Sequence, residues 1–520
     1  MSDAYDIAIV GSGFAGSLLA MVAHKLGRTV LLLERGSHPR PVIGESSTPL
    51  ANLLLEELAT RYDLEALRPL SKWGTWQRSH PELACGLKRG FTFHHHVLGR
   101  PVPPDPGRRD QLLVAASPHD DVADTHWYRA DFDHFFVREA QRLGVEYADR
   151  VKLDRMYDDG SVVGLEGVRD GRAVRHRARF VIDATGSRGF LHRTLKLGEA
   201  QFPNYPATEA LYSHFSGVAK LADGNASRLA GHDVPPYSID DAAVHHVFDG
   251  GWVWVLQFNN GITSAGVAAT SRIADQLRFE EGAPAWQRLL DGIPGLREQF
   301  ATARAEAPFT HMPQLSFRSD RIAGDKWAML PSAAGFVDPL LSTGFVLTLL
   351  GVGRLAEVIG HKWGTEEFGV SLGEYATKTE AELLAAGRMT AALYTTMGNF
   401  PAFTSLSLLY FAAASYSEAA RRLNRLDLAP SFLLHDDGAF GPLCLSLFER
   451  ARTVRTGEES RRLSEEIRCA IEPWNVAGLG DPARRNWYPV QSKDLIDSAW
   501  KLNATKLEAA DLMVRCGFSL

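Results

Sequence analysis

The sequence is poor in cysteine and has no strong excess of either charge. Only four cysteines occur in 520 residues, and Cys85, Cys444, Cys469 and Cys516 form no CxxC pair. Neither a zinc site nor a disulfide framework is therefore indicated. The net charge is -6, from 56 basic and 62 acidic residues, which gives no electrostatic reason to expect nucleic acid or an anionic membrane as a partner. A small-molecule substrate and a reducing cytoplasm are the simplest expectations.

The sequence also lacks a long uninterrupted apolar run. Its most apolar stretches, 345–360 and 405–415, are short or interrupted by charges such as Arg354, whereas a bilayer span takes about 20 apolar residues. We expect these stretches to be buried helices. The N-terminus enters a strand pattern at once, without a basic leader followed by an apolar segment, so secretion is not expected. Internal repeats and low-complexity linkers are missing as well.

What the sequence does contain is an alternation of strands, glycine turns and helices. Residues 5–34 predict a strand, a glycine turn, a helix and a second strand, which make a βαβ unit. Residues 161–183 predict two strands joined by a tight turn, and residues of about 205–315 are rich in strands. Helical periods follow over 371–396 and 458–470. Together these patterns predict an α/β fold.

The glycine turn after the first strand has the spacing of a dinucleotide-binding loop. Glycines at its three positions permit a tight turn and a close approach of pyrophosphate, and the helix N-terminus supplies unpaired N–H groups. An acid at the end of the next strand can accept hydrogen bonds from ribose hydroxyls, which favours FAD or NAD over NADP. The predicted contacts are Gly11, Gly13, Phe14, Ala15, Gly16, Glu34 and Arg35.

Two later segments favour FAD over NAD, because proteins of the flavin hydroxylase superfamily use them. The first is Asp183-Ala184-Thr185-Gly186, directly after an apolar strand. The second runs from Gly335 to Gly344 and ends at the start of a predicted helix, where backbone N–H groups can hold an anionic or electron-rich group.

Three segments make the chain resemble the flavin-dependent halogenases. They are Gly44-Glu45-Ser46-Ser47-Thr48-Pro49, Gly86-Leu87-Lys88-Arg89-Gly90-Phe91, and the FxxPxxSxG pattern of Phe336, Pro339, Ser342 and Gly344. The resemblance runs from residue 5 to about residue 360. It implies a two-dinucleotide-domain flavoprotein of the FAD-dependent hydroxylase type. Its expected parts are an FAD-binding core over 1–360, with a substrate sheet over about 205–315, and a helical domain over 361–520 that covers the substrate side.

The resemblance also implies a reaction and its residues. Reduced FAD, oxygen and chloride or bromide would give hypohalous acid, and Lys88 would aim the halogen at an electron-rich ring in secondary metabolism. A buried lysine suits this role, since burial lowers its pKa and its nitrogen can donate to hypohalous acid. Further implied FAD contacts are Glu45, Ser46, Ser47, Asp183, Gly186, Asp338 and Gly344. The implied halide contacts are Pro339, Ser342, Thr343 and Gly344.

Two partners follow from the same reasoning. No second dinucleotide fingerprint follows the first, so we expect a separate flavin reductase to supply reduced FAD. The aromatic substrate could arrive free or tethered to a carrier protein.

Three departures from the halogenase pattern bear on the substrate and on the activity. Members that halogenate tryptophan carry a glutamate where this chain has Leu341, so phenols, resorcinols or pyrrole-like rings, which are activated by their own heteroatom, are expected in place of indole. Leu256-Gln257 replaces Ile-Pro of the family's WxWxIP element, which leaves an aromatic hydroxylase or reductase of the same fold as an alternative. Ser332 stands where many relatives have an acid, which leaves a flavin-binding protein without catalysis as another.

The run His94-His95-His96 invites a metal site. Consecutive residues of a strand point to opposite faces, so the three rings cannot all reach one ion. We therefore expect no metal, and one or two of these histidines could instead face the substrate.

Overall fold

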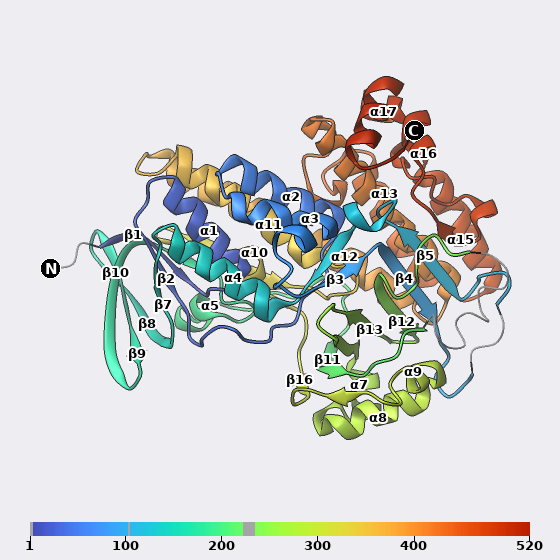
Figure 1. Ribbon diagram of the computed structural model, residues 1–520, viewed down its shortest axis with the longest axis horizontal. Coiled ribbons are helices and arrows are strands. Elements are labelled where there is room, and N and C mark those ends of the chain that lie inside the picture. The colour runs from blue at the N-terminus through green and yellow to red at the C-terminus, as the bar shows by residue number, and fades with distance from the viewer. Residues whose placement is uncertain (1–3, 102–104, 222–233, 520) are drawn as a thin grey trace.

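Two large β-sheets lie next to each other, each flanked by helices, in a computed structural model that describes residues 4–101, 105–221 and 234–519 (Figure 1). The N-terminal sheet and its helices form one half of the molecule. The second sheet and the C-terminal helices form the other half.

The first sheet has eight strands and a parallel centre. Its order is β18-β19-β10-β1-β2-β7, and β8 and β9 extend it from β10 as an antiparallel hairpin. The central strands β1 and β2 are apolar and almost wholly buried, as expected for parallel strands with both faces covered. The strands are β1 (Tyr5–Val10), β2 (Val30–Leu33), β7 (Glu146–Ala148), β8 (Val151–Asp159), β9 (Val162–Arg169), β10 (Arg172–Asp183), β18 (Ala323–Gly324) and β19 (Trp327–Met329).

Four helices form a layer over this sheet (Figure 1). They are α1 (Phe14–Lys25), α2 (Pro49–Arg61), α4 (Arg129–Arg142) and α11 (Thr343–His361). Helices α1 and α4 contact the strands, α11 packs on α1, and α2 packs on α11. The predicted βαβ unit over 5–34 is confirmed as β1-α1-β2 with parallel strands.

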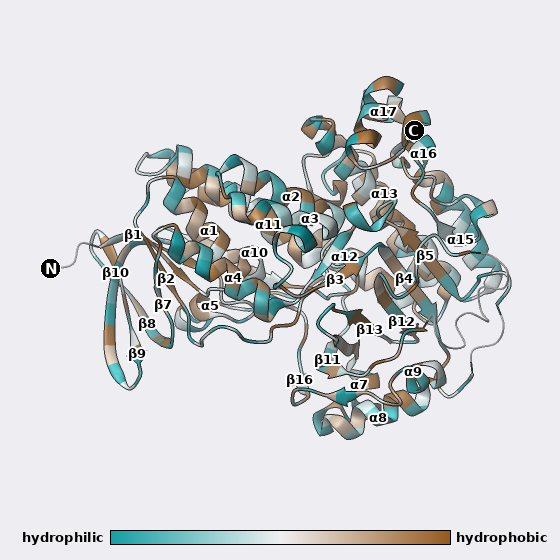
Figure 2. Ribbon diagram, in the orientation of Figure 1, coloured by the Kyte–Doolittle hydropathy of each residue, from teal (hydrophilic) through white to brown (hydrophobic). Residues whose placement is uncertain are grey.

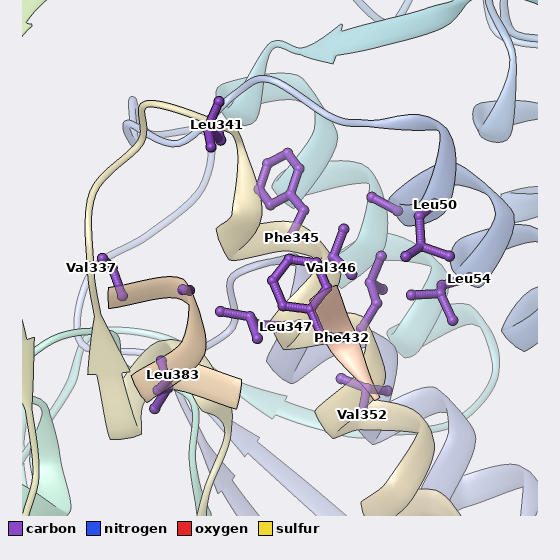
Figure 3. Packing of buried hydrophobic residues seen from close by; sticks show 14 of the residues in the cluster. Leu50, Leu54, Val337, Leu341, Phe345, Val346, Leu347, Val352, Leu383 and Phe432 are labelled. Atoms are coloured by element: carbon purple, nitrogen blue, oxygen red, sulfur yellow. The ribbon is translucent and has the colours of Figure 1, made fainter. Parts of the chain in front are cut away.

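Helix α11 is the one described helix that is long and apolar enough, by length and composition, to span a membrane. Two-thirds of its most apolar window is buried inside the protein, because α11 lies between α1, α2 and α12 (Glu367–Thr396). Its apolar character is therefore that of a core helix. Figure 3 shows Phe345, Val346 and Leu347 of α11 among Leu50 and other buried side chains.

The second sheet has nine strands in the order β15-β11-β14-β13-β12-β4-β5-β21, with β16 beside β11. It extends beyond the predicted range of 205–315, since β4, β5 and β21 come from outside it. The strand β4 is buried on both faces and so shows no polar–apolar alternation. The strands are β4 (Gly90–His95), β5 (Gln111–Ala115), β11 (Thr208–Ser216), β12 (Ala243–Phe248), β13 (Gly251–Gln257), β14 (Ile262–Thr270), β15 (Arg304–Ala305), β16 (Thr310–Met312) and β21 (Trp487–Tyr488).

Small elements join the two halves. Strands β3 (Cys85–Lys88) and β6 (Asp124–Trp127) form an antiparallel two-stranded ladder, and β17 (Phe317–Arg318) pairs with β20 (Gly335–Phe336). The shorter helices are α3 (Trp73–Ser79), α5 (Phe190–Thr194), α7 (Ser271–Leu277), α8 (Ala283–Gly292), α9 (Pro294–Gln299) and α10 (Pro331–Ala334).

The C-terminal part is helical, as the periodicity predicts, apart from β21. Helix α13 is largely apolar (Figure 2) and most of its residues are buried. Two of its rings, Phe403 and Phe411, pack edge-to-face against the rings of β4. The long helical period over 371–396 belongs to α12, and the period over 458–470 belongs to α15 (Gly457–Ala470). These helices are α13 (Phe400–Arg422), α14 (Phe440–Thr453), α15 (Gly457–Ala470), α16 (Ser492–Asp497) and α17 (Lys506–Arg515).

The packing of α1 against β1 gives a prediction for stability. A Cβ atom on Gly16 would lie 1.9 Å from the carbonyl oxygen of Gly11, a backbone atom that cannot swing aside. Gly16→Ala should therefore lower the free energy of unfolding by about 1–3 kcal/mol. Chemical denaturation of both proteins measures the change. The matched control is Gly373→Ala on the exposed side of α12, where no atom lies within 4 Å of the added Cβ; it should stabilise the protein by up to about 1 kcal/mol. Equal stability of the Gly16→Ala variant and the wild type would contradict this account.

Candidate active site

The glycine turn between β1 and α1 contains two kinds of glycine, those that the fold itself requires and one that it does not. Gly11 has φ +103° and its Cβ would meet the Ala184 backbone at 2.6 Å, so Gly11, like Gly16, is required by the fold. Gly13 has an ordinary φ of -61°, and the nearest protein atoms to its Cβ, in Arg129 and Asp133, are 3.6 Å away. No side chain caps α1. The protein itself thus does not need a glycine at 13, whereas a pyrophosphate approaching the helix N-terminus does.

Glu34 follows directly after Leu33, the last residue of β2, and lies beside this turn, one residue beyond the observed end of the strand that the sequence predicts to end at Glu34. Its carboxylate accepts hydrogen bonds from the N–H groups of Gly36 (2.8 Å) and Ser12 (3.1 Å) and lies 3.3 Å from Arg40. Burial acts to raise the pKa of Glu34, but Arg40 and these donors outweigh it and lower the pKa. The carboxylate is therefore ionised and able to accept from a ribose.

The other predicted contacts of the turn differ in what they can offer a dinucleotide. The side chain of Phe14 packs against Trp127 and Phe345, at ring-centroid distances of 5.4 and 5.2 Å. Ala15 is buried too, so only the backbone of these two residues is open to a ligand. Arg35 is exposed.

The segment 44–48 lies along β6 and is held by its backbone and side chains. The N–H of Trp127 donates to the Glu45 carbonyl at 2.6 Å, and the Ser47 hydroxyl donates to the Thr125 carbonyl at 2.7 Å. Arg129 donates to the Gly44 carbonyl at 2.9 Å. On Glu45, Oε1 lies 2.8 Å from His214 Nε2, while Oε2 is buried without a hydrogen-bond partner. The segment therefore has a fixed course and one acceptor left unused.

Lys88 is fully buried at the end of β3. Its Nζ donates to the Ser46 hydroxyl at 2.9 Å and to the Ser47 carbonyl, and it lies 3.9 Å from the centre of the Phe91 ring. Burial lowers the pKa of Lys88, although the nearby Asp124 carboxylate opposes this. The structure thus brings together three predicted site residues, Lys88, Ser46 and Ser47, away from water.

The loop before α11 presents an open helix N-terminus. Ser342 adopts a left-handed conformation (φ 54°) and Thr343 begins the helix, with no side chain capping it. Gly344 is exposed, and no atom lies within 4 Å of the position of a Cβ. Pro339 shapes the loop, since its carbonyl accepts the N–H of Ser342 at 3.0 Å. Because no side chain caps the helix, the backbone N–H groups of its first turn, at Thr343 and Gly344, can hold an anion.

Asp338 and Asp183 use their carboxylates inside the protein. Asp338 accepts from the hydroxyls of Tyr394 (2.8 Å) and Tyr205 (3.3 Å) and from the N–H of Leu340 (2.9 Å), and burial raises its pKa to about 6. Asp183 accepts from Thr185 and from the N–H of Leu191 at 2.6 Å. Both carboxylates fix loops at the predicted site, and their contact with FAD stays a prediction. Gly186 follows in a left-handed conformation (φ +83°) with open space around it.

An apolar cavity of about 200 Å³ lies next to Lys88, under the C-terminal helices. Asp124 and Phe91, the neighbours of Lys88, line it together with Tyr410 and Phe411 of α13. The Tyr410 hydroxyl donates to the Leu341 carbonyl at 2.9 Å, which ties the cavity wall to the loop before α11. Sequence reasoning missed Asp124 and Tyr410, because neither belongs to a motif.

The three consecutive histidines lie as strand geometry requires. His95 faces Asp110 at 3.1 Å, while His94 and His96 lie on the other side near His246. Burial lowers the pKa of His94 to about 4 and of His96 to about 3, so both are neutral. Within the residues that the structure describes, no group of three histidine, cysteine or acidic residues has the arrangement of a metal site. None of the three lines the cavity beside Lys88.

Comparison with known proteins agrees with this geometry. The tryptophan halogenase family profile matches residues 124–397, just over half of the chain. Tetracycline 7-halogenase from Kitasatospora aureofaciens is 27% identical, over 98% of this chain and 95% of the relative. The 1H-pyrrole-2-carbonyl-[peptidyl-carrier protein] brominase from Pseudoalteromonas luteoviolacea is 25% identical, over 69% of this chain and 80% of the relative.

The fold has a close counterpart among solved structures. Halogenase PltM in complex with phloroglucinol and FAD superposes with a TM-score of 0.79 at 23% identity, covering 92% of this chain and 99% of that one. This likeness covers both sheets and the C-terminal helices. The hydroxylase or reductase alternative is not favoured, because these relatives are halogenases. The chain belongs to the tryptophan halogenase family and is an FAD-dependent halogenase of aromatic substrates.

Proposed function

We propose that this enzyme delivers chlorine or bromine to an electron-rich phenolic ring in secondary metabolism, by way of hypohalous acid and Lys88. The observation that carries the proposal is the position of Lys88, which is wholly buried between the 44–48 segment and an apolar cavity. A reactive halogen species released there meets a lysine and a substrate before it meets water.

The residues around the glycine turn fit FAD. Gly13 and the N-terminus of α1 admit the pyrophosphate, and Glu34 accepts from the ribose. When bound and reduced, FAD would pass two electrons to oxygen and so bring it to the peroxide level, at which it can take two more electrons from the halide to give hypohalous acid. The open N–H groups at Thr343 and Gly344 are the proposed halide site, with Pro339 and Ser342 shaping the turn.

Lys88 directs the oxidised halogen. Its Nζ is anchored on one side by Ser46 and Ser47, so its remaining hydrogen-bonding capacity is available to hypohalous acid. Burial lowers its pKa, which makes both the ammonium and the free amine accessible. The ammonium donates to the oxygen of hypohalous acid, and the amine can form a haloamine.

The substrate side favours a ring that needs no added negative charge. Leu341 is buried and apolar, so it cannot supply the carboxylate that an indole needs, while a phenol activates itself. A cavity of about 200 Å³ has room for a single aromatic ring, since a cavity of roughly 150 Å³ binds benzene. The phloroglucinol bound to the related fold is a ring of this kind.

The partners and the division of the chain complete the proposal. A separate reductase supplies reduced FAD, and the substrate arrives free. Presentation on a carrier protein is the second arrangement, favoured by the carrier-protein brominase among the relatives. Residues 1–360 hold FAD and the halide, and the helices of 361–520 cover the substrate. A reducing cytoplasm suits four cysteines that are all free.

Phenol selectivity tests the substrate class. Under identical supply of reductase, FAD, oxygen and bromide, resorcinol should be brominated at least about tenfold faster than tryptophan, because an electrostatic aid missing at Leu341 is often worth several kcal/mol. Initial rates by mass spectrometry measure this ratio. A faster rate on tryptophan would show that another residue supplies the charge.

The glycine turn gives a second test, of cofactor binding. Gly13→Ala should weaken FAD binding about 5- to 150-fold, since the methyl group meets the pyrophosphate, while the thermal midpoint of the FAD-free protein stays unchanged. Fluorescence titration with FAD and a melting curve report the two effects separately. Normal affinity would remove the turn from the cofactor site.

Lys88→Met gives the third test. It removes the ammonium but keeps the volume of the buried side chain, which a buried site tolerates well. FAD binding and the rate of flavin reoxidation should persist, while halogenated product falls at least about 100-fold. The control is Lys152→Met on the exposed side of β8, which should leave all three unchanged. Loss of FAD binding by Lys88→Met would make Lys88 structural.

A further inference from the structure

Asp124 is a buried carboxylate that the proposed reaction does not yet use. It begins β6, directly opposite Lys88 in the antiparallel ladder of β3 and β6. Directly opposite residues of such a pair have their side chains on the same face, with Cβ atoms about 4.5–5.5 Å apart. Among the described residues, however, the hydrogen bonds of the two side chains go elsewhere: Lys88 donates to Ser46 and Ser47, and Asp124 accepts from Asn52.

One carboxylate oxygen of Asp124 accepts a hydrogen bond, and the other has no hydrogen-bond partner. Oδ1 accepts from the amide of Asn52 at 2.8 Å, while Oδ2 is buried without any hydrogen-bond partner. A buried carboxylate oxygen left unpaired costs free energy and calls for an explanation. Asp124 also lines the cavity beside Lys88, in which Phe91, Phe411 and Val346 provide apolar walls. An acceptor in an apolar cavity fixes the orientation of whatever enters it.

The positive charge of Lys88 beside Asp124 limits which chemical groups of a substrate Asp124 can bind. The Lys88 ammonium lies on the same face. Lys72, Arg422 and Glu418 add two cations and one anion to the lining. A further cation in the cavity would therefore be repelled. A neutral donor attached to the ring avoids this repulsion and still satisfies Oδ2. Because the ring must also be electron-rich, a phenolic hydroxyl meets both requirements.

We propose that Asp124 binds the ring hydroxyl of the substrate through Oδ2 and takes its proton as the halogen is transferred. This inference rests on the proposed halogenation of a phenol and assigns its general base. Lys88 and Asp124, side by side on the ladder, then hold the electrophile and the nucleophile of one reaction.

Lys88 and Asp124 together donate and accept the protons that move in this step, and both return to their starting states. As a ring carbon forms its bond to the halogen, the oxygen–halogen bond of hypohalous acid breaks, and its oxygen leaves as water with a proton from Lys88. The hydroxyl proton passes to Asp124, which gives a ring ketone. Loss of the proton from the halogenated carbon to the Lys88 amine, and return of a proton from Asp124 to the ring oxygen, restore the aromatic phenol and both side chains.

The test compares an aromatic substrate that carries a hydroxyl proton with one that has none. Resorcinol and 1,3-dimethoxybenzene are both electron-rich single rings, but only resorcinol can give a hydroxyl proton. Asp124→Asn should cut the bromination rate of resorcinol about 100-fold or more and change that of 1,3-dimethoxybenzene less than about threefold. Asp154→Asn, the same substitution on the exposed side of β8, should change neither rate.

A parallel measurement separates this inference from the function on which it rests. Oxidised bromide caught by a freely diffusing 1,3-diketone, without any ring substrate, should be equal for the wild type and Asp124→Asn. If Asn at this position prevents folding, Asp124→Leu replaces it, since apolar residues often substitute for buried charges without loss of stability; the same contrast between the two rings is expected.

Each other outcome overturns a definite statement. Equal losses on the two rings, or no loss on resorcinol, overturn the role of Asp124 while halogenation stands. A wild-type enzyme that oxidises bromide but brominates neither ring overturns the phenolic substrate and this inference together. A wild-type enzyme that oxidises no bromide overturns the proposed reaction itself.

Discussion

The burial of the Lys88 ammonium is the constraint on which the site depends. An unpaired charge in an apolar interior is costly, and it is tolerated only where other groups satisfy it. Here the Ser46 hydroxyl, the Ser47 carbonyl and the face of the Phe91 ring do so, with the Asp124 carboxylate nearby. All four come from segments outside the glycine turn. The 44–48 segment and the β3–β6 ladder must therefore both be in place before the lysine can be.

The rest of the fold holds these segments in register. The segment 44–48 is fixed along β6 by hydrogen bonds from Trp127 and Ser47, and α2 begins immediately after it, at Pro49. Helix α11 packs on α2 and begins at Thr343, directly after the loop that contains Leu341. From the other half, Tyr410 of α13 reaches the Leu341 carbonyl. The loop before α11, which is the proposed halide site, and the cavity wall are thus connected by a hydrogen bond.

The sequence predicted best what is local and missed what is assembled from distant segments. The βαβ unit, the long helices and the position of Glu34 follow from periodicity and short motifs. The second sheet was only partly predicted, because β4 and β5 are buried on both faces and show no alternation, and β21 is two residues long. Asp124 and Tyr410 could not be found, since they become site residues only through pairing with Lys88 and Leu341. Asp338 was identified, but its tyrosine partners, Tyr205 and Tyr394, lie far away in sequence.

The arrangement around Lys88 also gives the transfer a direction. Ser46 and Ser47 bind Nζ from the side of the 44–48 segment, whereas Phe91 and Asp124 belong to the wall of the cavity. On the proposed mechanism, a halogen species held by Lys88 would pass toward this wall, which consists of apolar groups and a carboxylate. Residues of the C-terminal helices line this cavity, so on the same mechanism they influence which ring carbon lies nearest the lysine. The proposed chemistry of oxidation then belongs to the N-terminal half, and the choice of substrate and of ring position belongs to the helices that line the cavity.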